Sequence, residues 1–285
     1  MPVRRGGRVV EGGGLENRCT GNRTVGSNPT SSESSPVNAF DEWLKALEAR
    51  HLANLTRAEL TRSLRALSSC YVERRDRLAR GAALEGAGKR AAFALFYAPL
   101  HFLTIDRVVR ALPADVARSG IVDLGCGTGA AGAAWSMALS QRPPVTAVDR
   151  NPWAVQEANW TYRQLGLRGR AMVGDVTSAF SQTRRTNALV LAYTANELPA
   201  DKRDVVLDAL VDRARAGVAV LIVEPIARGV ASWWPEWTAK MSAAGARIDE
   251  WRFQADLPPL LADIAKGAGL DPRELTARSI FAAPR

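Results

Sequence analysis

The feature that most constrains the fold of this chain is a short apolar segment that ends in an acid and runs into alternating glycines. Ile121-Val122-Asp123-Leu124 is followed directly by Gly125-Cys126-Gly127-Thr128-Gly129. An apolar run of this length predicts a buried strand. Glycines after a strand allow a tight turn into a helix and let a ligand approach the backbone closely. The sequence therefore predicts a strand, a turn and a helix with a binding site at the turn.

Two further predicted strands end in acids, in the order in which they follow the glycine turn. Val145–Asp149 ends 20 residues after Gly129, and a carboxylate at Asp149 can accept hydrogen bonds from both hydroxyls of a ribose. Arg170–Val173 is followed closely by Asp175, which can accept a hydrogen bond from an adenine amine. The three strand ends together predict a site for a ligand that contains adenosine.

Short apolar segments alternate with helix-length segments from Pro113 onward. The predicted strands are Gly120–Leu124, Val145–Asp149, Arg170–Val173, Ala188–Ala192 and Val218–Val223, with a last strand at Leu275–Phe281. The predicted helices are Gly129–Ser140, Pro152–Leu165, Asp201–Ala214, Ala231–Ala244 and Leu257–Ala268. Strands that alternate with helices are typical of a parallel sheet, so we predict an α/β domain over residues 113–285 with helices on both faces of the sheet.

A helical subdomain is predicted ahead of the sheet, over residues 39–112. Apolar residues recur mostly at three- and four-residue spacing between Phe40 and Tyr71, which predicts helix over residues 39–80. Residues 81–88 are small and include glycine, as in a loop. Residues 89–112 resume as an apolar, aromatic helix that Pro99 is expected to kink or break.

Residues 1–38 are polar, contain many glycines and lack apolar periodicity. One interpretation is a disordered tail, because such a segment buries too little apolar surface to offset the chain entropy. The other concerns the gene. Gly26-Ser27-Asn28-Pro29 is the in-frame translation of the T-arm consensus of a tRNA gene, which places the true start near Val37. The nucleotide sequence decides between the two.

The composition excludes several classes of protein. Three widely spaced cysteines and two histidines among 285 residues argue against a disulfide scaffold and a metal centre, and they suit a reducing compartment. Apolar runs stay shorter than the roughly 18 residues of a membrane span, and no signal peptide is visible. We therefore expect a cytoplasmic protein without a membrane partner; the oligomeric state stays open.

The basic excess lies toward the N-terminus. The chain carries 38 basic and 29 acidic residues, a net charge of +9, of which residues 113–285 contribute only +2. Arginine supplies 33 of the basic residues, a bias that a GC-rich genome also produces. A polyanionic partner is therefore expected, if anywhere, at the helical subdomain around Arg74, Arg75, Arg77 and Arg80.

The glycine turn and the acids at the strand ends resemble those of the class I, Rossmann-like methyltransferases that depend on S-adenosylmethionine. The resemblance covers about residues 113–285 and implies a Rossmann-like sheet with S-adenosylmethionine as the cofactor. It also implies residue roles: Asp123, Gly125, Gly127 and Gly129 on the methionine and ribose side, Asp149 on the ribose, and Asp175 with Val176 on the adenine.

A nicotinamide dinucleotide is the alternative ligand, because the six residues from Gly125 to Ala130 also fit the G-x-G-x-x-A pattern of dehydrogenases. Asp123, two residues before the first glycine, and Asp175 after the third strand argue against it. No second nucleotide-binding half is evident either. We therefore favour a methyltransferase.

The methyl acceptor is expected to face the loop after the fourth predicted strand, residues 193–199. The Asn-Pro-Pro-Tyr type of motif is absent there, and so is a pair of catalytic cysteines. Asn196 and Glu197 are the candidate catalytic residues, which would orient or deprotonate the acceptor. The alternative is that they cap the next helix. Tyr193 is expected to pack on the cofactor, and Tyr97 and His101 are candidates for closing the site.

Two short motifs, Asn196-Glu197-Leu198-Pro199 and Leu221-Ile222-Val223-Glu224-Pro225, resemble the small-ribosomal-subunit methyltransferase-like family of bacteria and mitochondria. This resemblance implies rRNA or the small ribosomal subunit as the partner. Members of that family commonly carry iron–sulfur cysteines after the fifth strand, whereas this chain has none after Cys126, so we expect no cluster. Two functions follow: a methyltransferase with rRNA as the candidate acceptor, or a ribosome-assembly or RNA-binding factor that retains the fold without catalysis.

The tryptophans Trp233, Trp234 and Trp237 follow the fifth predicted strand, and Trp251 lies beside Arg252. They can stack on bases or on an aromatic substrate. We favour the alternative, in which such a cluster packs a helix onto a sheet.

Overall fold

A computed structural model describes residues 36–73, 84–114, 119–184, 187–226 and 231–284. All of them belong to one compact unit, Ser35–Arg285. The two interpretations of the N-terminal segment concern residues that lie mostly outside the described ranges. The arginine cluster at residues 74–80 lies outside them as well.

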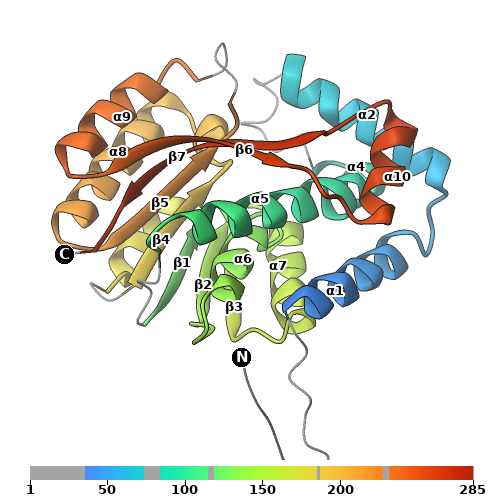
Figure 1. Ribbon diagram of the computed structural model, residues 1–285, viewed down its shortest axis with the longest axis horizontal. Helices are drawn as coiled ribbons and strands as arrows, with labels where there is room; N and C mark the ends of the chain where they lie inside the picture. Colours follow the sequence, from blue (N-terminus) through green and yellow to red (C-terminus); the bar gives the residue numbers. More distant parts are fainter. Residues whose placement is uncertain (1–35, 74–83, 115–118, 185–186, 227–230, 285) are drawn as a thin grey trace, which may run out of the picture. The chain divides into compact units, whose positions relative to one another are not determined.

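A seven-stranded sheet forms the centre of the described chain (Figure 1). Its order is β3-β2-β1-β4-β5-β7-β6. The strands are β1 (Gly120–Leu124), β2 (Val145–Asp149), β3 (Gly169–Val173), β4 (Asn187–Ala192), β5 (Ala219–Glu224), β6 (Arg247–Gln254) and β7 (Glu274–Ala282). Strands β1 to β5 are parallel, and β7 runs antiparallel between β5 and β6. The predicted α/β fold with a Rossmann-like sheet is thereby confirmed.

Helices cover both faces of the sheet, because apolar side chains alternate between two cores along the buried strands. In β1, Ile121 belongs to one core and Val122 to the other. The sheet helices are α6 (Ala130–Ala138), α7 (Pro152–Gln164), α8 (Ala200–Arg215), α9 (Trp234–Ala243) and α10 (Pro259–Ala268). Short 3₁₀ turns are η3 (Val176–Gln182) and η4 (Ala195–Glu197). Helices α6 and α7 contribute to the core that holds Ile121, and α8 and α9 to the other.

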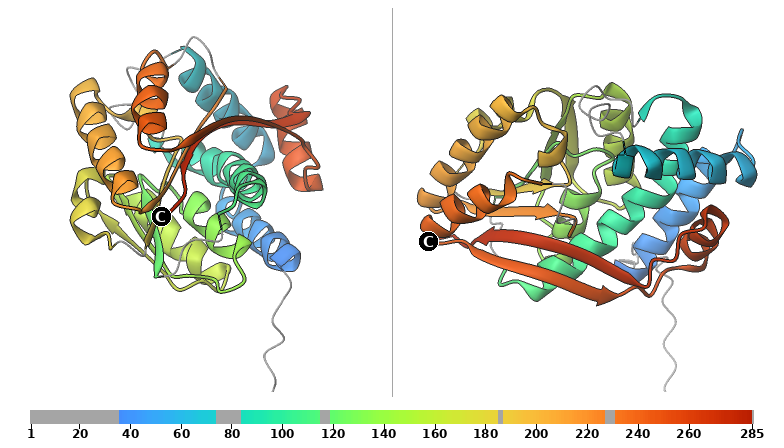
Figure 2. Two further views of the ribbon diagram at one scale, coloured as in Figure 1. Left: turned by 60° about the vertical axis from the view of Figure 1, so that its left-hand side comes forward. Right: turned by 90° about the horizontal axis from the view of Figure 1, so that it is seen from above.

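The N-terminal helices pack into the same core as α6 and α7 rather than into a core of their own. They are α1 (Pro36–His51), α2 (Arg57–Glu73), α4 (Ala87–Ala92), the π-helix η2 (Phe93–Tyr97) and α5 (Ala98–Ala111). Figure 2 shows α2 next to α10 and α5 along the sheet. The division into a subdomain ending at residue 112 and a domain starting at residue 113 stays a prediction.

The helix predicted over residues 39–80 is interrupted between α1 and α2. Thr56 and Glu59 explain the interruption, since they form a capping box that starts a new helix. The Glu59 carboxylate accepts hydrogen bonds from the Thr56 backbone N–H and hydroxyl, both at 2.8 Å. The Glu59 N–H in turn donates to the Thr56 hydroxyl at 3.3 Å.

The helix over residues 87–111 runs through Pro99 without a break, contrary to the expected kink or interruption. Five residues wind as a π-helix, Phe93–Tyr97, directly ahead of the proline. A proline lacks a backbone N–H and crowds the preceding turn, and a local π turn relieves this within a continuous helix.

The stretch Ala87–Ala111 is long and apolar enough to cross a membrane, which was not recognised from the sequence. In the structure, 61% of its most apolar 18 residues is buried inside the protein.

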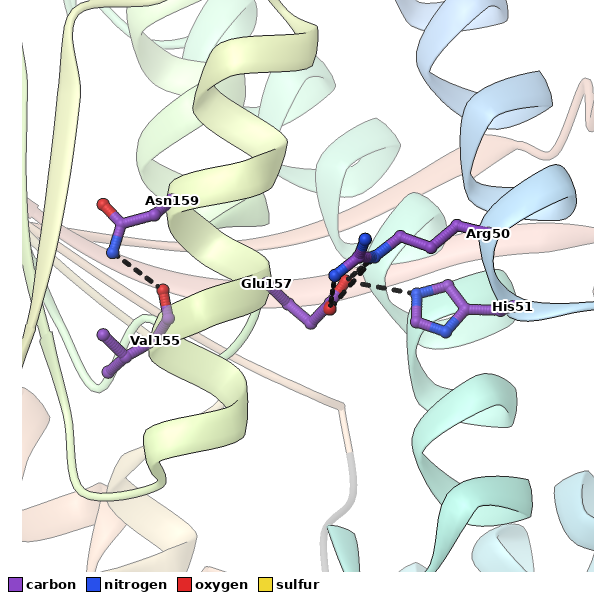
Figure 3. A network of polar contacts seen from close by, with 5 residues as sticks. All are labelled: Arg50, His51, Val155, Glu157 and Asn159. Carbon is purple, nitrogen blue, oxygen red and sulfur yellow. Dashed lines mark hydrogen bonds and ion pairs between the residues drawn. The ribbon is translucent and has the colours of Figure 1, made fainter.

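Helix α1 is fastened to α7 by a buried carboxylate (Figure 3). Glu157, which is 3% exposed, accepts hydrogen bonds from Arg50 Nη2 at 2.7 Å and from His51 Nε2 at 3.2 Å. Burial alone would raise the pKa of Glu157, but the hydrogen bonds from His51 and Arg50 outweigh it and lower the pKa below its usual range. The first helix is therefore joined to the helix that follows β2.

Strand β6 was not predicted. Its sequence places charged residues on the exposed side and Trp251 and Phe253 on the other, and the exposure alternates along the strand. An edge strand of this kind has too few apolar residues to stand out in a sequence. The expectation of a parallel sheet is wrong for the β5–β7 and β7–β6 pairs, which are antiparallel because β7 runs opposite to its two neighbours.

Candidate active site

The glycine turn joins β1 to α6, and its three alternating glycines all have positive φ. The values are 71° for Gly125, 52° for Gly127 and 84° for Gly129, a region that favours glycine over other residues. Space is restricted as well. A Cβ at Gly129 would lie 2.9 Å from the ring of Tyr162, and one at Gly125 would overlap the Thr194 side chain. The turn therefore requires its glycines for its backbone conformation and for its packing.

Asp149 holds the glycine turn at the end of β2. Its Oδ2 accepts the Gly127 N–H at 2.9 Å, and its Oδ1 accepts the Asn151 N–H at 2.8 Å. The side chain is half-buried. An ionised carboxylate has about four acceptor positions, so roughly two remain for ligand hydroxyl groups. The predicted proximity of Asp149 to the glycine turn is thus present in the structure.

Asp123 lies beneath the turn and is 1% exposed. Its Oδ2 accepts the N–H of Gly132, in the first turn of α6, at 2.8 Å. Burial raises the pKa of Asp123 to about 7, although the Gly132 hydrogen bond acts in the opposite direction. The contacts of Asp123 thus brace β1 against α6, the helix that follows the turn.

Asp175 follows β3, near the same edge of the sheet, and is engaged with two partners. Its Oδ1 accepts the N–H of Thr177 at 3.1 Å, and its Oδ2 forms an ion pair with Lys202 Nζ at 2.5 Å. The hydrogen bond from Lys202 is the main reason why the pKa of Asp175 falls to about 2. The next residue, Val176, is buried. The adenine roles of Asp175 and Val176 stay predictions.

The loop after β4 touches both the glycine turn and the N-terminal helices. Tyr193 has a φ of 57°, which is uncommon for a residue other than glycine and marks local strain. Its ring stacks on His101 of α5, with ring centroids 3.8 Å apart. The Thr194 hydroxyl donates at 3.0 Å to a backbone oxygen on either side, of Gly125 and of Ala192.

An uncharged aromatic group lies above the glycine turn. It consists of Phe93, Tyr97, His101 and Tyr193, each half-buried. Phe93 is the member closest to the turn, 3.6 Å from where a Cβ of Gly127 would be. Burial lowers the pKa of His101 to about 3, so its ring is neutral near pH 7. Sequence reasoning had named Tyr97 and His101 for this place but missed Phe93.

Asn196 is tied at both ends of its side-chain amide. Its Nδ2 donates to Glu224 Oε2 at 2.7 Å, and its Oδ1 accepts the Trp233 Nε1–H at 3.0 Å. Glu224, the last residue of β5, is fully buried and also accepts the Ala195 N–H at 3.0 Å. Sequence reasoning missed Glu224 as a functional residue. The available signal was an acid that ends an otherwise apolar strand.

Glu197, the other candidate catalytic residue, has no such partners. It is half-buried, and no described residue donates a hydrogen bond to its carboxylate. Burial, together with the negative charge of Asp149, raises the pKa of Glu197 to about 7, against a smaller opposing effect of Arg150. A carboxyl group with this pKa can accept a proton near neutral pH.

The remaining candidate residues have structural partners. Trp233, Trp234 and Trp237 are at most 9% exposed and pack α9 into its core, as the favoured interpretation expected. Trp251 donates its Nε1–H to Ser279 Oγ at 2.8 Å. The Cys126 thiol is buried, and burial raises its pKa. Within the described ranges, no group of three or more His, Cys, Asp or Glu side chains is arranged to hold a metal ion.

Residues 106–192 match the family model of the methyltransferase small domain. The matched segment contains the glycine turn, Asp149 and Asp175. Over this segment, the match confirms the resemblance to methyltransferases that the sequence predicted. None of the curated proteins matches the sequence of this chain.

Several solved structures are distantly similar to this chain. Mitomycin 7-O-methyltransferase is 17% identical, with 89% of this chain and 74% of that chain covered and a TM-score of 0.45. The O-methyltransferase TomG from Streptomyces achromogenes, solved in complex with SAM, is 11% identical, with 65% and 80% covered and a TM-score of 0.43. Precorrin-6y C5,15-methyltransferase from Geobacter metallireducens is 9% identical, with 63% and 86% covered and a TM-score of 0.41. These likenesses are too distant to indicate an acceptor.

Proposed function

We propose that this protein binds S-adenosylmethionine at the glycine turn and transfers its methyl group to an acceptor at the loop after β4. The observation that carries the proposal is the hydrogen bond from Gly127 N–H to Asp149 Oδ2, at 2.9 Å. It joins the glycine turn, whose backbone a ligand can approach closely, to a partly exposed carboxylate that can still accept further hydrogen bonds. This combination suits a ribose next to a small charged group.

The residues around the turn fit an adenosine ligand with a methionine arm. Asp149 would accept hydrogen bonds from the ribose hydroxyls. Gly125 and Gly127 would leave room for the methionine arm. The buried Thr128 Oγ1, which has no hydrogen-bond partner among the described residues, is a polar atom available close by. Asp175 with Val176 would face the adenine. When bound, the cofactor supplies an electrophilic methyl group on a positively charged sulfur.

Glu197 is the group that we assign to the proton of the acceptor. Its carboxyl group is half-buried, and no described residue donates a hydrogen bond to it. Burial and repulsion by the negative charge of Asp149 raise its pKa to about 7. A neutral nucleophile must lose a proton when it is methylated, and a base with a pKa near the working pH serves this purpose. Asn196, whose amide is occupied at both ends, is better suited to holding the loop than to meeting the acceptor.

For the acceptor we propose rRNA, which would place the enzyme and its partner, the small ribosomal subunit, in the cytoplasm. Support comes from the sequence motifs around Asn196 and Glu224 and from the net charge of the helical segment, where residues 39–112 carry 13 basic and 8 acidic residues. The uncharged aromatic group above the turn suits a planar, neutral ring. The second candidate function, an assembly or RNA-binding factor without catalysis, rests on the same motifs and charge.

Calorimetry with S-adenosylmethionine tests the first part of the proposal. Wild type should bind, and Asp149→Ala should weaken binding at least about tenfold because a ribose partner and the support of the turn are both lost. Asp204→Ala, an exposed acid on α8, is the matched control and should bind like wild type. Failure of the wild-type protein to bind would contradict the enzyme assignment.

Mass spectrometry of rRNA from a deletion strain tests the acceptor. A single missing methyl group, restored by wild type but not by Glu197→Gln, supports catalysis on rRNA. Unchanged rRNA methylation together with defective small subunits favours the non-catalytic factor. Unchanged rRNA with normal subunits contradicts both and directs the search to small metabolites.

A further inference from the structure

The loop after β4 is fastened from three directions. Tyr193 stacks on His101 of α5, and Thr194 donates to the backbone oxygen of Gly125 in the glycine turn. The third attachment is to β5, where Glu224 accepts the Ala195 N–H at 3.0 Å and the Asn196 amide at 2.7 Å. This third attachment is fully buried at Glu224 and lies immediately before Glu197 in sequence.

The hydrogen bonds of this attachment have a fixed direction. Trp233 Nε1 is always a donor, so the Asn196 Oδ1 must face it and the Asn196 Nδ2 must face Glu224. At position 224 two donors then converge on one side chain, from Ala195 N and Asn196 Nδ2. Only a group that accepts at both oxygens satisfies both donors. A carboxyl group does so, because each of its oxygens keeps an acceptor lone pair even when one of them is protonated, whereas a side-chain amide has only one acceptor atom.

Arg278 lies near this carboxyl group without an ion pair to it. Burial raises the pKa of Glu224 to about 8, although the hydrogen bond from Ala195 and the charge of Arg278 act in the opposite direction. Arg278 lies directly opposite Glu224 in the ladder between β5 and β7. It is 8% exposed, and its guanidinium lies 4.0 Å from the centre of the Trp234 ring. Among the described ion pairs within 4 Å, none joins Arg278 to Glu224. The oxygens of Glu224 therefore stay with the loop, while a buried positive charge lies nearby.

We propose that Glu224 is a positioning residue, which holds the loop after β4 so that Glu197 lies at the edge of the sheet beside Asp149. The inference rests on the proposed function, since Glu197 has a task only if an acceptor is methylated there. The proposal requires that the side chain at position 224 accept two hydrogen bonds. A side chain of the same size that accepts only one should not hold the loop.

A polarity swap tests the proposal. Glu224→Gln keeps the size of the side chain but turns one acceptor into a donor, which then faces either Asn196 Nδ2 or Ala195 N–H. The double variant Glu224→Gln with Asn196→Asp restores the pattern, because the amide introduced at position 224 can donate to the carboxylate introduced at position 196, which can also accept the Trp233 Nε1–H. The matched control is Glu250→Gln, since Glu250 also lies opposite Arg278, in β6, but is exposed and far from the loop in sequence.

The first readout is hydrogen–deuterium exchange of peptides that cover residues 193–198, measured without any ligand. We expect exchange about tenfold faster in Glu224→Gln, recovery toward wild type in the double variant and no change in Glu250→Gln. Unchanged exchange in the single variant, or no recovery in the double variant, overturns the proposal. Far-ultraviolet circular dichroism of each variant shows whether it has folded.

The second readout is the affinity for S-adenosylhomocysteine, measured by calorimetry on the same four proteins. The loop contacts the glycine turn through Thr194. In Glu224→Gln a smaller fraction of the protein molecules should hold the loop in the conformation that binds the ligand, which should weaken binding about fivefold. The double variant should bind like wild type. If wild type does not bind at all, the proposed function fails, while the exchange data still decide whether Glu224 holds the loop. Normal affinity together with fast exchange overturns the link between loop and site.

Discussion

The ring of His101 lies flat on the ring of Tyr193, with centroids 3.8 Å apart and planes inclined by 14°. This stack joins the helix that follows the π turn to the loop after β4. Neither residue is near the other in sequence, so the N-terminal helices help to shape the reaction edge of the sheet. The helical segment and one face of the sheet also share one core.

The stack predicts that His101 acts through its shape and not through its charge. Its pKa of about 3 keeps the ring neutral between pH 5 and 8. His101→Phe should therefore leave the affinity for S-adenosylhomocysteine, and its dependence on pH over this range, within about twofold of wild type. His101→Ala, which removes the stack, should weaken binding. A pH dependence that disappears in His101→Phe would show that the imidazole does titrate in the folded protein.

Gly129 should tolerate no side chain. Gly129→Ala combines a φ of 84° with a Cβ placed 2.9 Å from the Tyr162 ring, and we expect a loss of about 2–5 kcal/mol in the free energy of unfolding. Gly166→Ala is the matched control, because Gly166 also has a positive φ, 63°, but has open space around it. It should lose only about 1 kcal/mol. Urea unfolding measures both; equal losses would mean that the packing against Tyr162 contributes nothing.

Glu157 should contribute stability that acid removes. Glu157→Gln replaces charge-assisted hydrogen bonds to Arg50 and His51 by weaker ones, and we expect a loss of about 2 kcal/mol near pH 7. The pKa of Glu157 is lowered in the folded protein, so this stability is present above its ordinary value of 4.5 and is lost as the pH falls through the folded value. Urea unfolding from pH 7 down to pH 3 should therefore show the variant and wild type converging. A constant difference at all pH values would contradict the linkage.

Glu197 should give stability the opposite dependence on pH. Its pKa is raised from 4.5 to about 7, so between these values the folded protein holds a proton that the unfolded chain releases. Stability then falls as the pH rises, by at most about 1.4 kcal/mol per pH unit for one group. Glu197→Gln should make the decline between pH 5 and 7 shallower, with the remainder due to Asp123 and Glu224. Glu85→Gln, a substitution of an exposed acid, should keep the wild-type slope of the free energy of unfolding against pH. If Glu197→Gln also keeps this slope, the pKa of Glu197 is not raised by folding.

The parallel part of the fold was predictable because its signals are local. Strands β1 and β2 coincide with the predicted Gly120–Leu124 and Val145–Asp149, since each is a mostly apolar run bounded by polar, proline or glycine residues. The glycine turn and the acids at the strand ends followed from the same runs. Strand β6 escaped because its apolar residues Ile248, Trp251 and Phe253 are separated by charged residues and do not form an apolar run.

The candidate site was predictable in its residues but not in their partners. Asn196 and Glu197 were identified together, yet the structure gives them different surroundings: Asn196 is bound by Glu224 and Trp233, and Glu197 is bound by neither. The difference depends on a residue 28 positions away, Glu224, and on the antiparallel strand that brings Arg278 opposite it. Sequence spacing alone contains no information about such a contact.

The π turn at Phe93–Tyr97 has a consequence for how the chain length can vary. A π turn holds one residue more than an α turn, and each residue of an α-helix turns the chain by about 100° and advances it by about 1.5 Å. Deleting one residue inside Phe93–Tyr97 would therefore leave a continuous α-helix with α4 and α5 in their present registers. Deleting one residue elsewhere between Ala87 and Ala111 would rotate the parts of the helix before and after the deletion by about 100° relative to each other, so that one of them loses its present contacts. Homologous chains should accordingly lose or gain single residues at this turn and at no other point of the helix.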